Sequence, residues 1–187
     1  MQKVEGSAEG SNSFTIDVQD QEGQCIYVDQ TRHILLSRQY MLMLNDNVLV
    51  EEPAPSFNWV IGNRTKTLGK YRVQQATTTF RGRKYEVWFA PDLPLPLGPW
   101  KFGGLPGLIL EAYDTDKLFV FEAMTIDLPA KVLTPVLPPT QGQKVAGWDA
   151  YCKLLKTTRV RWLKSMQAES PGVTVTISSA DGQEIMP

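Results

Sequence analysis

The chain has 187 residues, a length that suits one folded domain with its own hydrophobic core. Hydrophobic residues make up 42% and charged residues 21% of the sequence, which argues against a disordered chain. The 19 basic and 20 acidic residues give a formal net charge of −1, so no general attraction to nucleic acid is expected, and no apolar run approaches the roughly 18 residues of a membrane-spanning helix.

The amino terminus offers little apolar surface. Residues 1–13 are rich in Gly, Ser, Glu and Asn and are expected to fray. They lack the apolar run of a secretory signal, which leaves open a cytoplasmic protein or a mature chain whose signal has been removed. Phe14, Ile16 and Val18 then alternate with polar residues, and this pattern predicts a strand at the start of a single domain over 14–187.

A hairpin is predicted within residues 32–50. Its strands are the apolar segments on either side of residues 45–47, Asn-Asp-Asn, which tolerate left-handed backbone and are typical of a hairpin tip. Because proline supplies no ladder hydrogen bond, two prolines predict a connection over residues 51–56. A further turn is expected at Gly62 and Asn63.

The next segment contains the clearest hairpin signal, followed by a proline-rich strap. Residues 71–80 alternate as a strand does and carry several threonines. Arg81 and Gly82 separate them from a second strand over 85–89, and glycine there can take the positive φ of a short turn. Four prolines within residues 91–99 exclude a regular helix, so this strap is expected to cross the domain in extended form.

The C-terminal part changes from strands to a helix. Residues 108–114 and 118–127 predict a second hairpin, and the proline-rich residues 129–143 predict a surface connection. Apolar residues near a 3.6-residue period predict one long helix over about 147–167, followed by a last strand over 173–177. The apolar residues of the helix are Trp148, Tyr151, Leu155, Trp162 and Met166.

The most informative string is GPWKFGGLPGLIL at residues 98–110. Pro106 presets φ for the second place of a β-turn and Gly107 accepts the positive φ of the third, which predicts a type II turn. The motif is read as a structural turn that leads into a core strand, and a ligand-contacting loop is the alternative. Its residues are Gly103, Gly104, Leu105, Pro106, Gly107, Leu108 and Ile109.

This string, together with the sequence ATTTFRGRKY at residues 76–85, resembles the GLPGLI family, which is named for the string at residues 104–109. The resemblance is strong from about residue 59 to residue 121. It implies secreted or periplasmic proteins of Bacteroidota, made with a signal peptide in the precursor, whose activity is not established. Where the resemblance implies a cysteine this chain has Val73, so a disulfide of the family type cannot form at that position.

Few residues are available for catalysis. The only histidine, His33, falls within a predicted strand and is read as structural. One histidine with the distant Cys25 and Cys152 gives neither a nucleophile–base pair nor a metal-ligand spacing, so no metal and no cofactor are expected. The two cysteines form either one disulfide or two buried thiols. Paired carboxylates remain the catalytic option, and the available acids are Glu86, Glu111, Asp114, Asp116 and Glu122.

Five residues are candidates for contact with a ligand or partner. Arg81 and Arg83 lie at a predicted hairpin tip, where they either contact an anion or partner or form a solvated basic turn. Trp88, Trp100 and Phe102 either line an apolar groove or fill the core.

The predicted fold is mainly β (α+β): a curved antiparallel meander sheet, with a half-open barrel as one form of it, and one C-terminal helix docked on it. The predicted function is a non-catalytic cell-envelope module that binds a partner protein or an apolar ligand through the concave side of the sheet. An envelope hydrolase with paired carboxylates and a purely structural module are the alternatives. No nucleic acid and no transmembrane segment are expected.

Overall fold

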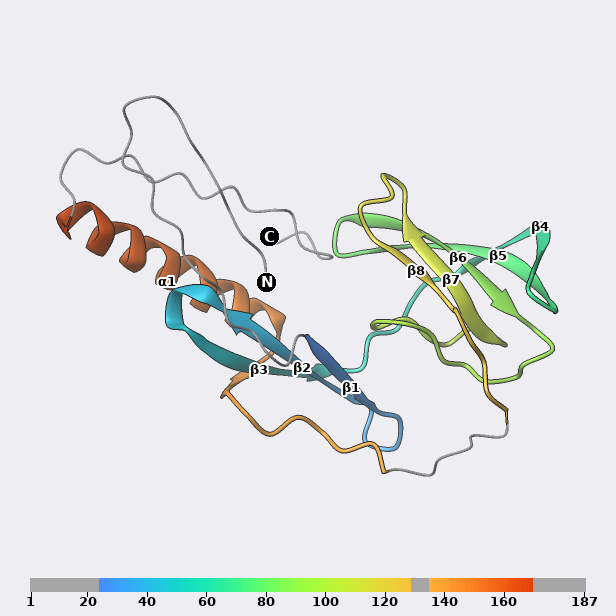
Figure 1. Ribbon diagram of the computed structural model, residues 1–187, viewed down its shortest axis with the longest axis horizontal. Coiled ribbons are helices and arrows are strands. Elements are labelled where there is room, and N and C mark those ends of the chain that lie inside the picture. The colour runs from blue at the N-terminus through green and yellow to red at the C-terminus, as the bar shows by residue number, and fades with distance from the viewer. Residues whose placement is uncertain (1–23, 129–134, 170–187) are drawn as a thin grey trace.

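The computed structural model describes residues 24–128 and 135–169, which form nine strands and one α-helix. The mainly β class with one C-terminal helix is therefore confirmed (Figure 1). The helix α1 covers Trp148–Glu169, close to its predicted bounds, and a short 3-10 helix, η1, covers Leu42–Leu44. The strands are β1 (Cys25–Asp29), β2 (Ile34–Met41), β3 (Asp46–Pro53), β4 (Val60–Leu68), β5 (Tyr71–Phe80), β6 (Arg83–Ala90), β7 (Leu108–Asp114), β8 (Val120–Glu122) and β9 (Gln143–Ala146).

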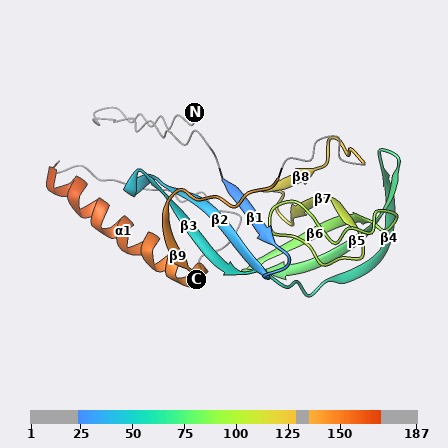
Figure 2. The same ribbon diagram turned by 90° about the horizontal axis from the view of Figure 1, so that it is seen from below.

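The strands form two sheets, where the sequence predicted one meander. The first sheet has the order β1-β2-β3-β9, and β9 runs parallel to β3. The second sheet is an antiparallel meander, β4-β5-β6-β7-β8, and the described strands close into no barrel. Figures 1 and 2 both place the first sheet between α1 and the second sheet. The chain passes from one sheet to the other through residues 54–59.

The first hairpin differs from its prediction at both ends. Met41 pairs with Asp46, so η1 forms the tip and Asn45 takes the left-handed φ of 50°; the predicted tip at 45–47 was placed too late. The predicted connection over 51–56 was wrong in its first half, because β3 continues to Pro53. Beyond Glu51 only β2 pairs with β3, so the missing N–H of Pro53 costs no bond to β9.

The second sheet follows the sequence prediction more closely. The β5–β6 hairpin has a two-residue turn in which Arg81 and Gly82 both have positive φ, 44° and 79°, as a tight hairpin turn requires. The turn predicted at 62–63 was wrong, because these residues belong to β4. The pairing of β4 with β5 shifts register there, as a bulge between Ile61 and Thr65. The strand predicted at 118–127 is much shorter, since β8 has only three residues.

The strap predicted at 91–99 runs beside the start of β7. The carbonyl of Leu93 accepts the amide of Leu108, and the carbonyl of Leu97 accepts the amide of Ile109, both at 2.9 Å. Leu105 and Ile109 are buried and pack with Phe102 against one face of the second sheet. The motif thus fixes the strap and carries the chain into a core strand.

The type II turn predicted on Gly107 is wrong. Positive φ occurs at Gly104, at 83°, whereas Gly107 has no left-handed backbone. Gly107 is required for a different reason, because a β-carbon there would lie 2.2 Å from the carbonyl oxygen of Ala90. Close passage against the end of β6, rather than turn geometry, therefore requires glycine at this position.

The helix α1 docks on the first sheet through its first two turns. Tyr151 and Cys152 are buried against Met41, Val48 and Val50. Trp148 and Leu155 pack beside them as predicted, whereas Trp162 is half-buried and lies outside this cluster. Cys152 and Cys25 are not joined by a disulfide. No helix in the described part of the chain has the length and apolar character to span a membrane.

The predicted place of His33 was wrong, and three predicted segments fall outside the described residues. His33 lies in the β1–β2 turn, exposed and with a φ of 52°, and not within a strand. The predicted frayed segment 1–13 and the predicted strands at 14–18 and 173–177 are outside the residues that the structure describes.

Candidate functional site

Polar side chains alternate along one face of the second sheet. Glu86 and Trp88 of β6 pair with Tyr113 and Glu111 of β7, and Gln75 of β5 pairs with Trp88. Because side chains two positions apart in a strand share a face, all five lie on the same side of the sheet. The opposite side carries the aromatic core around Phe89 and Phe102.

This polar face is concave. Lys66 of β4 reaches Glu111 of β7, with an Nζ–Oε2 distance of 2.5 Å, although two strands lie between them. The ammonium of Lys66 lies 4.4 Å from the ring centroid of Trp88, which is only 3% exposed. In Figure 2, β4 turns upward at the edge of the sheet. Lys66 thus joins the β4 side of the sheet to β7 across the buried Trp88 ring.

A hydrogen-bond network surrounds Glu86. Tyr113 donates its hydroxyl to Glu86, Gln75 donates an amide N–H to it at 2.5 Å, and Trp88 donates its indole N–H to the Tyr113 oxygen at 3.2 Å. Burial by itself would raise the pKa of Glu86, but the bonds from Tyr113 and Gln75 and the charge of Arg64 lower it overall. Burial and the neighbouring Glu86 carboxylate raise the pKa of Tyr113.

These opposite shifts predict a bell-shaped effect of Tyr113→Phe on stability. Because the pKa of Glu86 is lowered in the folded protein, its carboxylate stabilises the fold at pH values above the ordinary pKa of 4.5, and this contribution is lost as the pH falls below that value. Because the pKa of Tyr113 is raised in the folded protein, its neutral hydroxyl stabilises the fold at pH values below the ordinary pKa of 10.0, and this contribution is lost as the pH rises above that value. The free energy of unfolding of wild type minus variant, from urea titrations, should be largest between these values. A difference independent of pH would contradict the network.

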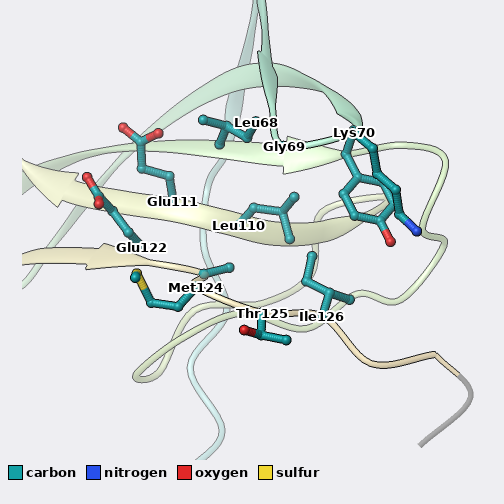
Figure 3. A pocket seen from close by; sticks show the side chains of 11 residues that line it. Leu68, Gly69, Lys70, Leu110, Glu111, Glu122, Met124, Thr125 and Ile126 are labelled. Atoms are coloured by element: carbon teal, nitrogen blue, oxygen red, sulfur yellow. The ribbon is translucent and has the colours of Figure 1, made fainter.

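A pocket of about 480 Å³ opens on the concave face (Figure 3). It is lined by the β4–β5 turn on one side and by residues 122–126 on the other, with Leu110 and Glu111 of β7 between. Elements from opposite ends of the meander therefore meet at one cavity. This pocket is called the concave pocket below.

A second cavity, of about 700 Å³, lies between the two sheets and is called the inter-sheet groove. Ile26 and Val28 of β1 line it from the first sheet. Phe57, Trp100 and Phe102 line it from the side of the second sheet, together with the glycines at 103 and 104. Gln30 and His33 are among the few polar side chains at this groove, and both are exposed.

A buried charge cluster joins the two sheets beside this groove. Glu52 of β3 accepts a hydrogen bond from Lys101 at 2.8 Å and forms an ion pair with Arg81 of the β5–β6 turn. The side chains of Lys101 and Glu52 are only 1% and 6% exposed. Both cations also lie over the Trp148 ring at the start of α1, at 4.5 Å for Arg81 and 5.0 Å for Lys101. Glu52, Arg81, Lys101 and Trp148 are called the junction cluster below.

The five candidate contact residues fall in three places. Arg81 belongs to the junction cluster, and Arg83 is buried and pairs with Asp114 at 3.2 Å, so these two arginines do not form a solvated basic tip. Trp88 forms the floor of the concave face, whereas Trp100 and Phe102 line the inter-sheet groove.

The carboxylates considered for catalysis also lie in three different places. Glu86, Glu111 and Glu122 belong to the concave side, Asp114 is held by Arg83, and Asp116 is exposed in the β7–β8 turn. No three potential metal ligands come together within residues 24–128 and 135–169.

Sequence reasoning missed Glu52, Lys66 and Lys101. The partners of these residues lie 45 to 49 positions away in the chain, which periodicity does not reveal. The one available signal was the position of Lys101 between Trp100 and Phe102 in the motif, because a lysine between two large aromatic residues points to a buried cation.

The comparisons with known proteins concern part of the chain. A family model described as a protein of unknown function (Porph_ging) matches residues 79–111, which include the β5–β6 turn, Lys101 and the motif. No curated protein matches the chain. Two structures of PNGF-II, in space groups C2 and P21, are similar, with TM-scores of 0.45 and 0.44 and sequence identities of 15% and 16%. The match covers 78% of this chain and 28% of PNGF-II, so the chain spans little more than a quarter of that protein.

Proposed function

We propose that this chain is a non-catalytic binding module of the cell envelope, of the GLPGLI type, that takes an apolar ligand in the inter-sheet groove. The observation that carries the proposal is the cavity of about 700 Å³ lined by Phe57, Trp100 and Phe102. The envelope location follows from the GLPGLI resemblance alone, which also predicts an exported precursor.

The lining of the groove favours an apolar ligand. Its volume falls within the range of about 300 to 1,000 Å³ that is usual for small-molecule sites. Three aromatic rings and the aliphatic side chains of Ile26 and Val28 supply apolar contact from both sheets. Gln30, His33 and Ser56 are exposed at the rim, where they can orient a ligand. Lys101 is the buried charged residue of the lining, and its ammonium is paired with Glu52.

The carboxylates give less support to the alternative, a hydrolase. A general acid needs a carboxyl group whose pKa is raised, whereas the pKa of Glu86 is lowered. Glu111 is tied to Lys66 by an ion pair. These two acids are better described as parts of a structural network than as a catalytic pair.

Binding of the neutral fluorescent probe N-phenyl-1-naphthylamine tests the groove. The full chain should bind the probe saturably, and Leu97→Asp should weaken binding at least about tenfold, because a carboxylate would enter the apolar lining. Leu97 is 44% exposed, so this variant should fold normally. Leu118→Asp is the matched control, since Leu118 is 61% exposed and lies outside the groove. Absence of saturable binding, or equal weakening by both variants, would reject the proposal.

A further inference from the structure

The concave pocket has charges of opposite sign at its two ends. Figure 3 shows Glu111 and Glu122 at one end and Lys70 at the other, with Leu110 between them. The apolar lining is made by Leu68, Tyr71, Leu110, Met124 and Ile126. A ligand that fills this pocket therefore meets an acidic end, an apolar middle and a basic end.

The acidic end has more negative charge than its neighbours neutralise. Glu111 and Glu122 are directly opposite in the β7–β8 pair, an arrangement that destabilises a sheet when the charges are alike. Lys66 pairs with Glu111, but Glu122 is exposed and forms no ion pair with another described residue. One net negative charge remains at this end, and an ammonium group placed there would relieve the repulsion.

The basic end is a single lysine held at a tight turn. Lys70 follows Gly69, whose φ of 57° forms the β4–β5 turn, and its ammonium lies 5.3 Å from the Tyr71 ring centroid. Lys70 is exposed and has no carboxylate partner within the described part of the chain. A ligand carboxylate would find an unpaired cation there.

We propose that the concave pocket binds a short apolar peptide through both of its free termini. The terminal ammonium lies at Glu122 and Glu111, the terminal carboxylate lies at Lys70, and the apolar side chains lie over Leu110. A fatty acid would leave the acidic end unpaired, and a polyamine would be repelled by Lys70. The volume of about 480 Å³ suits a ligand of this size. This site is separate from the inter-sheet groove, so the two proposals can fail independently.

Calorimetric titration with trileucine and its capped forms tests the role of each terminus. The full chain should bind trileucine at one site. Because solvent-exposed ion pairs contribute modestly, N-acetylation and C-amidation should each weaken binding about fivefold. Equal affinities for the free, acetylated and amidated peptides would overturn the proposal, as would the absence of saturable binding.

Two variants assign the ends of the pocket. Glu122→Gln should abolish the effect of N-acetylation and keep that of C-amidation, while Lys70→Gln should do the reverse. Glu51→Gln and Lys144→Gln are matched controls, since both side chains are exposed on strands of the first sheet and should leave both effects intact. If neither pocket variant changes the effect of a cap, the assignment of the termini is wrong.

Competition separates this site from the groove. Trileucine should leave the binding of N-phenyl-1-naphthylamine unchanged, and Leu97→Asp should leave trileucine binding unchanged. If trileucine displaces the probe, the peptide occupies the inter-sheet groove and the proposal for the concave pocket is wrong.

Discussion

Replacing Glu52 with glutamine is expected to lower the free energy of unfolding by about 3 to 5 kcal/mol, the cost of removing one partner from a buried ion pair. Lys101, whose side chain is 1% exposed, would lose its ion pair with the Glu52 carboxylate. Arg81 would lose its ion pair with the same residue. Two cations beside the Trp148 ring would then lack an anion within the junction cluster.

Urea titration of the full chain measures this loss. Glu51→Gln is the matched control, because Glu51 is the preceding residue of β3 but is exposed, and a change within about 0.5 kcal/mol is expected. Adding Lys101→Met to Glu52→Gln should recover part of the stability, since the buried cation that has lost its ion pair with Glu52 is then removed. If Glu51→Gln and Glu52→Gln have equal effects, the junction cluster does not stabilise the fold.

Gly107→Ala is expected to cost about 3 kcal/mol or more. The new β-carbon would lie 2.2 Å from the carbonyl oxygen and 2.7 Å from the carbonyl carbon of Ala90. Both are backbone atoms at the end of β6, so no side-chain rotation can relieve the clash, and overpacking of this kind costs about 1 to 3 kcal/mol or more. The strap and the start of β7 would have to shift away from β6.

Gly104→Ala separates this steric cause from backbone strain. Gly104 has a φ of 83° but open space around the position of a β-carbon, so alanine there should cost only about 1 to 2 kcal/mol. Pro106→Ala is the matched control within the motif, because Pro106 is exposed and its replacement should cost less still. If Gly104→Ala lowers stability more than Gly107→Ala does in thermal or urea unfolding, the steric explanation for Gly107 is wrong.

Local patterns predicted much of the second sheet. Alternation predicted β5 at its observed bounds, the second hairpin prediction placed β7 at its observed bounds, and the Arg81-Gly82 pair predicted the turn between β5 and β6. The turn expected at 62–63 failed because a glycine inside a strand marks a bulge as readily as a turn. The division into two sheets was not predicted, because it depends on which strands pair across distance.

The sites were harder to predict than the strands. Aromatic composition identified Trp100 and Phe102, which line the inter-sheet groove, but the same reasoning grouped them with Trp88 on a different face. Arg81 and Arg83 looked like a basic tip because their acidic partners, Glu52 and Asp114, lie 29 and 31 positions away. Such pairs are set by tertiary packing and have no local signature.

The parallel pairing of β9 with β3 has a mechanical consequence. The second sheet is contiguous in the chain, whereas the first is assembled from residues 25–53 and 143–146. Two covalent crossings therefore connect the sheets, one through residues 54–59 and one through residues 123–142. Cutting the backbone at either crossing leaves the halves attached through the other. The two sheets are thus joined by two chain connections, which restrict their relative movement more than a single linker would.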